Sequence, residues 1–130
     1  MFQYKATITD VIDGDTFDMD IDLGFHIHIH ERVRLFGIDT PEKFGVEKDL
    51  GLIVKQYAIN NFLGKEVIIK SEKVDTAADT DSFGRWLVIV NIYGEDIRDI
   101  YNALGVNKDH FTYSEDNVRK LEAIVRSLEV

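Results

Sequence analysis

Two short segments combine acidic and basic side chains in a pattern that suits the binding of a metal ion and a phosphate. Residues 13–16 read Asp-Gly-Asp-Thr, and residues 34–42 read Arg-Leu-Phe-Gly-Ile-Asp-Thr-Pro-Glu. Pro41 fixes its own φ angle and restricts Thr40 to extended conformations. A rigid backbone under converging charges can hold a ligand in one geometry. On these residues alone, a strand end capped by a solvent-facing polar turn is an equally good interpretation.

A third segment, residues 81–85, places an arginine where a polar loop enters a strongly apolar stretch. Arg85 is by itself a reasonable solvated charge at the start of a strand. Its guanidinium group could also clamp a phosphate through two parallel hydrogen bonds. The glycine at position 14, in the tight turn of the first segment, is expected to supply a backbone conformation that other residues resist.

A site that combined these segments would carry more acidic than basic groups. One Ca²⁺ would neutralise the excess, and carboxylate and carbonyl oxygens are the ligands that this ion prefers. We therefore predict a pocket that accepts a phosphodiester only when the metal ion is bound. The carboxylates and guanidinium groups that contribute to this charge count belong to Asp13, Asp15, Asp39, Glu42, Arg34 and Arg85.

The segment between these motifs contains two weaker candidates for metal binding. Residues 18–22 carry aspartates at alternate positions, but an EF-hand loop needs its glycine one residue earlier and a glutamate where Ile29 stands. We interpret these aspartates as the solvated face of a strand. His26, His28 and His30 also alternate and could bind a transition metal, although a polar strand face is the simpler interpretation.

Composition indicates one globular domain, residues 1–130. Of the 130 residues, 45% are hydrophobic and 30% charged, and none is cysteine. The net charge of −9, from 24 acidic and 15 basic residues, has the wrong sign for non-specific binding to nucleic acid. Any binding of a polyanion must therefore depend on a local site and a bound cation.

No apolar run of about 18 residues is present, so we expect no membrane interaction. The N-terminus enters an alternating pattern at once, with no visible signal peptide. This favours a cytoplasmic protein or the mature form of a secreted one. We expect a monomer.

Hydrophobic periodicity predicts the order of the elements. Period-two alternation is typical of strands, and spacing of three and four residues is typical of helices. In the third strand, Phe25, Ile27 and Ile29 are expected to face inward. The predicted strands are residues 2–12, 17–23, 25–37, 66–71 and 86–92, and the predicted helices are residues 50–62, 97–104 and 114–128, with Gly105 as a C-terminal cap.

Three strands, a helix, two strands and two helices follow the plan of the OB-fold. We therefore predict an α+β, mainly β, five-stranded Greek-key barrel with three helices. Such barrels often bind oligonucleotides, but the fold alone does not establish a function.

The motifs at 13–16 and 34–42, together with Gly84-Arg85, resemble those of the staphylococcal nuclease (thermonuclease) family. Residues 45–48, Gly-Val-Glu-Lys, are similar to the segment after that family's active-site loop. Order and spacing agree from about Tyr4 to Gly105. The resemblance implies an OB-fold endonuclease that hydrolyses RNA and single-stranded or denatured DNA with Ca²⁺ and leaves 3′-phosphate ends.

The resemblance also implies a role for each charged residue. Arg34 and Arg85 would bind the phosphate and stabilise the charge that develops on it. Glu42 would position or deprotonate the attacking water. The ligands of Ca²⁺, with Asp13 in a supporting position, would be Asp15, Asp39 and the carbonyl group of Thr40.

The sequence departs from the family around the substrate. Ser82 and Phe83 stand where the family usually has lysine and tyrosine. Phe83 and Tyr113 are the candidates for binding the substrate, with Tyr113 near the base. Together with the net negative charge, these changes predict weaker and more salt-sensitive substrate binding. The alternative interpretation is a non-catalytic OB-fold module that binds a protein or a nucleic acid.

Overall fold

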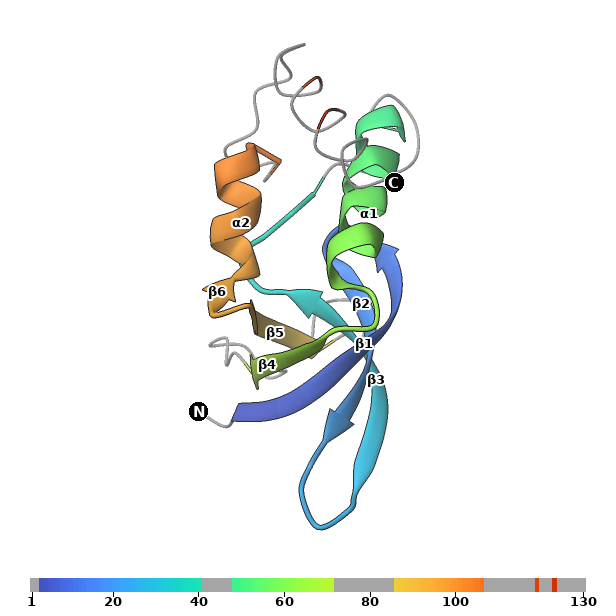
Figure 1. Ribbon diagram of the computed structural model, residues 1–130, viewed down its shortest axis with the longest axis vertical. Helices are drawn as coiled ribbons and strands as arrows, with labels where there is room; N and C mark the ends of the chain where they lie inside the picture. The colour runs from blue at the N-terminus through green and yellow to red at the C-terminus, as the bar shows by residue number, and fades with distance from the viewer. Residues whose placement is uncertain (1–2, 41–47, 72–85, 107–118, 120–122, 124–130) are drawn as a thin grey trace.

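The computed structural model describes residues 3–40, 48–71 and 86–106, together with Arg119 and Ala123. The predicted order of strands and helices is confirmed in this part of the chain, and a short strand precedes the second helix (Figure 1). The elements are β1 (Gln3–Asp13), β2 (Thr16–Asp22), β3 (His28–Leu35), α1 (Lys48–Phe62), β4 (Glu66–Ser71), β5 (Trp86–Ile92), β6 (Glu95–Asp96) and α2 (Ile97–Leu104).

The predicted helix over residues 114–128 lies almost wholly outside the described residues. Arg119 and Ala123 are described, and both are helical and exposed. None of the helices in the described part of the chain has the length and apolarity needed to cross a membrane.

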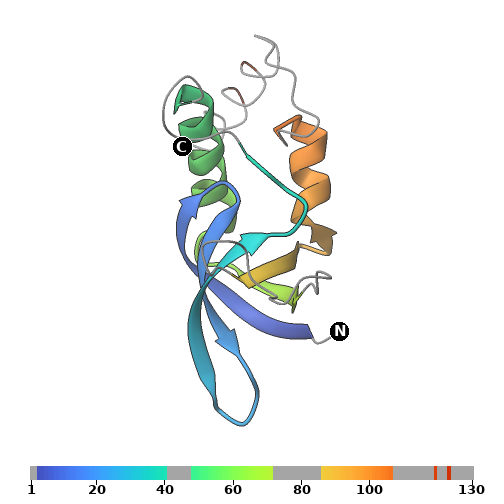
Figure 2. The ribbon, with the colours of Figure 1, turned by 180° about the vertical axis from the view of Figure 1, so that it is seen from behind.

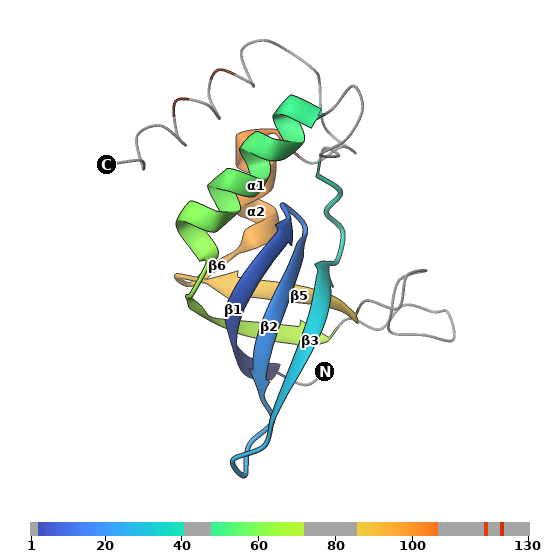
Figure 3. The same cartoon turned by 90° about the vertical axis from the view of Figure 1, so that its right-hand side faces the viewer.

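The sheet closes into the predicted five-stranded barrel. Its strand order is β3-β2-β1-β4-β5-β6, and β3 also pairs with β5. That closing pair is parallel, with Val33 opposite Trp86 and Leu35 opposite Val88, whereas the other neighbouring strands are antiparallel. Figure 3 shows β4 and β5 crossing behind β1, β2 and β3. This is the OB-fold.

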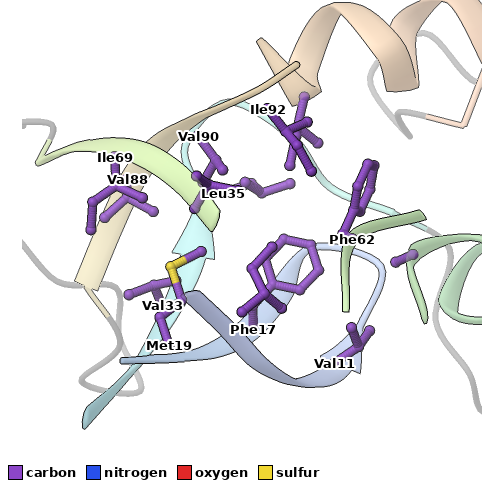
Figure 4. Close-up of a cluster of buried hydrophobic side chains, with 14 of the residues drawn as sticks. Val11, Phe17, Met19, Val33, Leu35, Phe62, Ile69, Val88, Val90 and Ile92 are labelled. Atoms are coloured by element: carbon purple, nitrogen blue, oxygen red, sulfur yellow. The ribbon is translucent and has the colours of Figure 1, made fainter. Parts of the chain in front are cut away.

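Alternate residues of the strands fill the barrel, because successive side chains of a strand point to opposite faces. Phe17 and Met19 of β2 are fully buried, as are Val33 and Leu35 of β3, and Phe17 lies opposite Val33 (Figure 4). The ring of Phe62, at the end of α1, meets the ring of Phe17 edge-on, with centroids 6.3 Å apart. Helix α1 therefore caps one end of the core.

Both helices lie at the same end of the barrel as the β1–β2 turn and the segment that follows β3 (Figures 2 and 3). Helix α2 has defined ends: the side chain of Asp96 accepts a hydrogen bond from the Arg98 N–H, and Gly105 adopts φ 75° as the predicted cap. Because both ends are capped, α2 is a well-defined support for the groups at this end.

The prediction that Phe25 and Ile27 face inward is wrong. Strand β3 begins only at His28, and Phe25 and Ile27 are 95% and 54% exposed in the loop between β2 and β3. Ile29, which was also predicted to face inward, is 37% exposed on β3. The β2–β3 hairpin extends beyond the barrel (Figure 1). Strand β1 pairs with β2 only as far as Asp22, and β5 meets β3 only from Val33. Among the described strands, none therefore covers the tip.

Candidate active site

Asp15 is anchored where the β1–β2 turn approaches the end of β3. Its side chain is nearly buried, and the residue is 7% exposed. One carboxylate oxygen, Oδ2, accepts the backbone N–H of Thr40 at 3.2 Å, and the other accepts the Thr16 hydroxyl at 3.1 Å. Its backbone carbonyl accepts the Leu35 N–H at 2.9 Å. The first two bonds orient the carboxylate, and the third fixes the backbone of Asp15 against the end of β3.

Arg34 is held between the two carboxylates of the predicted metal site. Its Nη2 lies 3.2 Å from Asp39 Oδ1 and 3.7 Å from Asp15 Oδ2. The arginine side chain is 26% exposed, so its ion pairs are less screened than surface pairs. The pairing of β3 with both β2 and β5 fixes the base of this side chain, with Thr16 and Leu87 as neighbours. Two carboxylates therefore converge on one cationic nitrogen.

The donors at this point fit a hard divalent cation by their chemistry. Carboxylates from Asp15 and Asp39 and a backbone carbonyl at Thr40 are oxygen ligands of the kind that Ca²⁺ takes. Within the described residues, no group of three or more histidine, aspartate or glutamate side chains is arranged to hold a metal ion. A bound cation would therefore complete its coordination with water or with substrate oxygens, which leaves room for a phosphodiester.

For the other predicted site residues, the structure gives either no position or only a place in the fold. Glu42, Arg85, Phe83 and Tyr113 lie outside the described residues, and their roles stay predictions. Asp13 is half-buried at the end of β1, opposite Thr16. Its supporting role also stays a prediction.

The histidines are not brought together on one strand face. His26 lies in the β2–β3 loop with φ 63°, and only His28 and His30 belong to β3. The Nδ1 of His28 lies 3.1 Å from Asp20 Oδ1 across the hairpin. This is a pairing of neighbouring strands, and in the described part of the chain it gathers too few ligands for a metal site.

Gly14 is needed for space and not for an unusual backbone angle. Its φ is outside the left-handed region, contrary to the expectation from the turn motif. A Cβ at this position would lie 2.5 Å from Val54 Cγ1 and 3.1 Å from Thr40 Oγ1. Val54 belongs to α1, so the missing side chain lets the turn, the helix and Thr40 pack together.

We expect Gly14→Ala to lower the free energy of unfolding by about 1–3 kcal/mol, as overpacking of a well-packed site does. Because the clash is with Val54, a Val54→Ala change in the same protein should recover part of that loss. Urea denaturation of the two single variants and the double variant measures the coupling. Strictly additive losses would contradict this account of Gly14.

Tyr101 is a residue of this region that sequence reasoning missed. It lies within the predicted helix 97–104 and is fully buried on the inner face of α2. Its hydroxyl donates a hydrogen bond to the carbonyl of Gly14, directly before Asp15. The available signal was the residue type, since a buried tyrosine usually needs a partner for its hydroxyl.

Alkaline pH should destabilise the protein through this tyrosine. Burial raises the pKa of the Tyr101 hydroxyl well above its usual value of 10.0, and the charge of Asp15 adds to the shift. Above pH 10 the unfolded chain loses this proton while the folded protein keeps it. Stability then falls as pH rises, by about 1.4 kcal/mol per pH unit for one such group.

Denaturation between pH 9 and 11.5 measures this slope. Tyr101→Phe should make this slope shallower, because it removes the group whose pKa burial raises most. Part of the slope should persist in Tyr101→Phe, because partial burial also raises the pKa of Tyr57. Equal slopes in the wild type and Tyr101→Phe would contradict the prediction.

A comparison with protein families shows which family the chain belongs to. A family model described as staphylococcal nuclease homologue matches residues 32–128. The chain belongs to this family. The matched range contains most of the chain, including Arg34, Asp39 and Thr40, and it confirms the resemblance drawn from the motifs. No curated protein matched the sequence.

The staphylococcal nuclease homologue match begins in β3, after the turn that carries Asp15. The tertiary structure nonetheless places Asp15 against Arg34 and Thr40, which are both within the matched range. The site therefore combines a family-matched segment with a residue from outside it. Proteins of this family are nuclease-like and bind nucleic acid, in keeping with the OB-fold of the barrel.

Proposed function

We propose that this protein is a Ca²⁺-dependent nuclease that hydrolyses phosphodiester bonds of DNA, RNA or both and leaves 3′-phosphate ends. The observation that supports this most directly is the convergence of Asp15 and Asp39 on the guanidinium group of Arg34. A nuclease of this kind needs an anionic metal site and a cation for the phosphate at the same point. The family membership supports the same reaction class.

In this proposal, each residue of the site has a role that follows from its chemistry. Asp15, Asp39 and the carbonyl of Thr40 would hold the ion, whose positive charge offsets the carboxylates and polarises the phosphodiester. Arg34 leaves its pairing with the carboxylates to bind the phosphate and stabilise its developing charge. Arg85 supplies the second guanidinium group in this proposal, and Glu42 orients the attacking water. The substrates are single-stranded or denatured DNA and RNA, bound by a monomer.

A non-catalytic binding module is the competing proposal, and the net charge of −9 is what favours it. A strongly acidic protein binds a polyanion poorly unless a local cation compensates. The two proposals differ in whether the protein cleaves a nucleic acid or only binds its partner. They also differ in the effect of metal removal on that cleavage.

Incubation of heat-denatured DNA, and separately of RNA, with the protein in Ca²⁺ or in EDTA tests the proposal. We expect degradation in Ca²⁺ at low salt, none in EDTA, and products that a 5′-kinase labels without prior dephosphorylation, since cleavage that leaves 3′-phosphates frees 5′-hydroxyls. Inertness of both substrates in Ca²⁺ across pH 7 to 10 would reject the enzyme and leave the binding module.

A further inference from the structure

The hydroxyl of Tyr101 joins α2 to the turn that carries Asp15. It donates a hydrogen bond to the Gly14 carbonyl, and the two residues are 87 positions apart in the chain. Tyr101 is fully buried, and it is among the largest buried side chains of the protein. Packing alone would be served by leucine or phenylalanine at this position. A buried hydroxyl with a specific acceptor instead defines where that acceptor must lie.

The position of the hydroxyl is itself fixed by neighbouring rings. The Tyr101 ring lies 6.1 Å from the ring of Phe62 and 6.4 Å from that of Tyr57, measured between centroids. Both neighbours belong to α1, and α2 is capped at Asp96 and Gly105. The hydroxyl therefore projects from a packed cluster between two helices. If the β1–β2 turn moved, the fixed ring would not move with it, and the hydrogen bond would be lost.

Because Gly14 precedes Asp15 in the turn, fixing the Gly14 carbonyl also restricts the position of Asp15. Asp15 follows Gly14, and its Oδ2 accepts the Thr40 N–H at 3.2 Å while lying 3.7 Å from Arg34 Nη2. A Cβ at Gly14 would lie 3.1 Å from the Thr40 hydroxyl oxygen, so Thr40 packs against the same turn. A shift of the Gly14 peptide would change both the Asp15 carboxylate and its bond to Thr40.

We propose that Tyr101 is a positioning residue of the site: its hydroxyl holds the β1–β2 turn so that Asp15 faces Thr40 and Arg34 in the geometry that a divalent cation requires. The inference rests on the proposed function for its metal, but the positioning of Asp15 can be measured without metal. In metal sites, groups that orient the ligands typically change metal affinity about 10- to 100-fold when they are removed.

Tyr101→Phe tests the proposal, because it removes the hydroxyl and keeps the ring. Tyr57→Phe is the matched control, since it makes the same change on a ring of the same cluster. Hydrogen exchange in the metal-free protein measures the protection of the Thr40 N–H, which donates a hydrogen bond to the Asp15 carboxylate. We expect the protection of this amide to fall about tenfold more than that of the β4 and β5 amides in Tyr101→Phe, and no such selective loss in Tyr57→Phe.

Calorimetric titration with Ca²⁺ is the second measurement. We expect the Kd for Ca²⁺ to rise about tenfold in Tyr101→Phe and to stay at the wild-type value in Tyr57→Phe. Unchanged Thr40 protection and Kd in Tyr101→Phe, or equal losses in both variants, would overturn the positioning role. If the wild type binds no Ca²⁺, the proposed function is rejected, and exchange at Thr40 alone decides the role of Tyr101.

Discussion

Replacement of Arg34 by alanine is expected to lower kcat on denatured DNA about 100- to 1,000-fold at saturating Ca²⁺. Losses of this size follow removal of one preorganised group that stabilises charge in the transition state, equivalent to roughly 2.7–4 kcal/mol. Ca²⁺ binding should survive the change, because Asp15 and Asp39 lose a competing cation that now lies 3.7 Å and 3.2 Å from them. Steady-state kinetics and calorimetry on the same variant separate the two effects.

Arg32 provides the matched control for Arg34. It lies on the same strand, and its Nε donates to Asp18 Oδ1 at 2.8 Å on the outer face of the hairpin, with the side chain 52% exposed. Arg32→Ala removes the same charge from the chain without touching the site, so kcat should stay near the wild-type value. Equal losses in the two variants would mean that Arg34 acts only through net charge, and activity retained in Arg34→Ala would exclude it from the reaction.

Phe62→Ala is expected to have the largest effect on stability, a loss of about 3–5 kcal/mol in the free energy of unfolding. The Phe62 side chain is fully buried at the end of α1. Its ring meets Phe17 of the barrel, Tyr57 of its own helix and Tyr101 of α2, at centroid distances of 6.3, 5.9 and 6.1 Å. Truncation would leave a cavity where both helices join the barrel. Chemical denaturation measures the loss.

Leu63 is the control for this prediction, because it is the next residue and is 39% exposed. Leu63→Ala should change the free energy of unfolding by no more than about 0.5 kcal/mol, as most surface substitutions do. A loss below about 1 kcal/mol in Phe62→Ala would show that the two helices are held to the barrel by other contacts. Because Phe62 also supports the Tyr101 ring, its truncation should weaken Ca²⁺ binding as well.

Local patterns in the sequence were enough to predict the five barrel strands, the first two helices and the fold. Alternation predicted five of the strands, and within them alternate residues such as Phe17, Met19, Val33 and Leu35 are buried in the barrel. This works because the pleat of a strand and the turn of a helix are local geometry, expressed directly as periods of two and of three to four residues. The prediction failed for Phe25, because alternation cannot tell where neighbouring strands end. That depends on how far β1 and β5 extend beside the hairpin.

The charged motifs also predicted which residue types form the site, but not their contacts. Sequence indicated that Arg34, Asp39 and Asp15 belong together by their charges and by their resemblance to a known family. The register of β2 against β3, which pairs Thr16 with Arg34, brings the β1–β2 turn to the end of β3, where Asp15 accepts a hydrogen bond from the Thr40 N–H. Such a contact joins residues 25 positions apart, and no local rule specifies it.

The structural roles of two residues became visible only in the tertiary structure. Gly14 was expected to supply a special backbone angle, whereas the structure shows that the packing of Val54 and Thr40 leaves no space for a side chain. The sequence placed Tyr101 within a helix, and the structure shows that its hydroxyl bonds to the turn of the site. The sequence by itself determined the fold and the charges available for chemistry. The tertiary structure decided what holds Asp15 and Arg34 in place, because that depends on close packing between segments far apart in the chain.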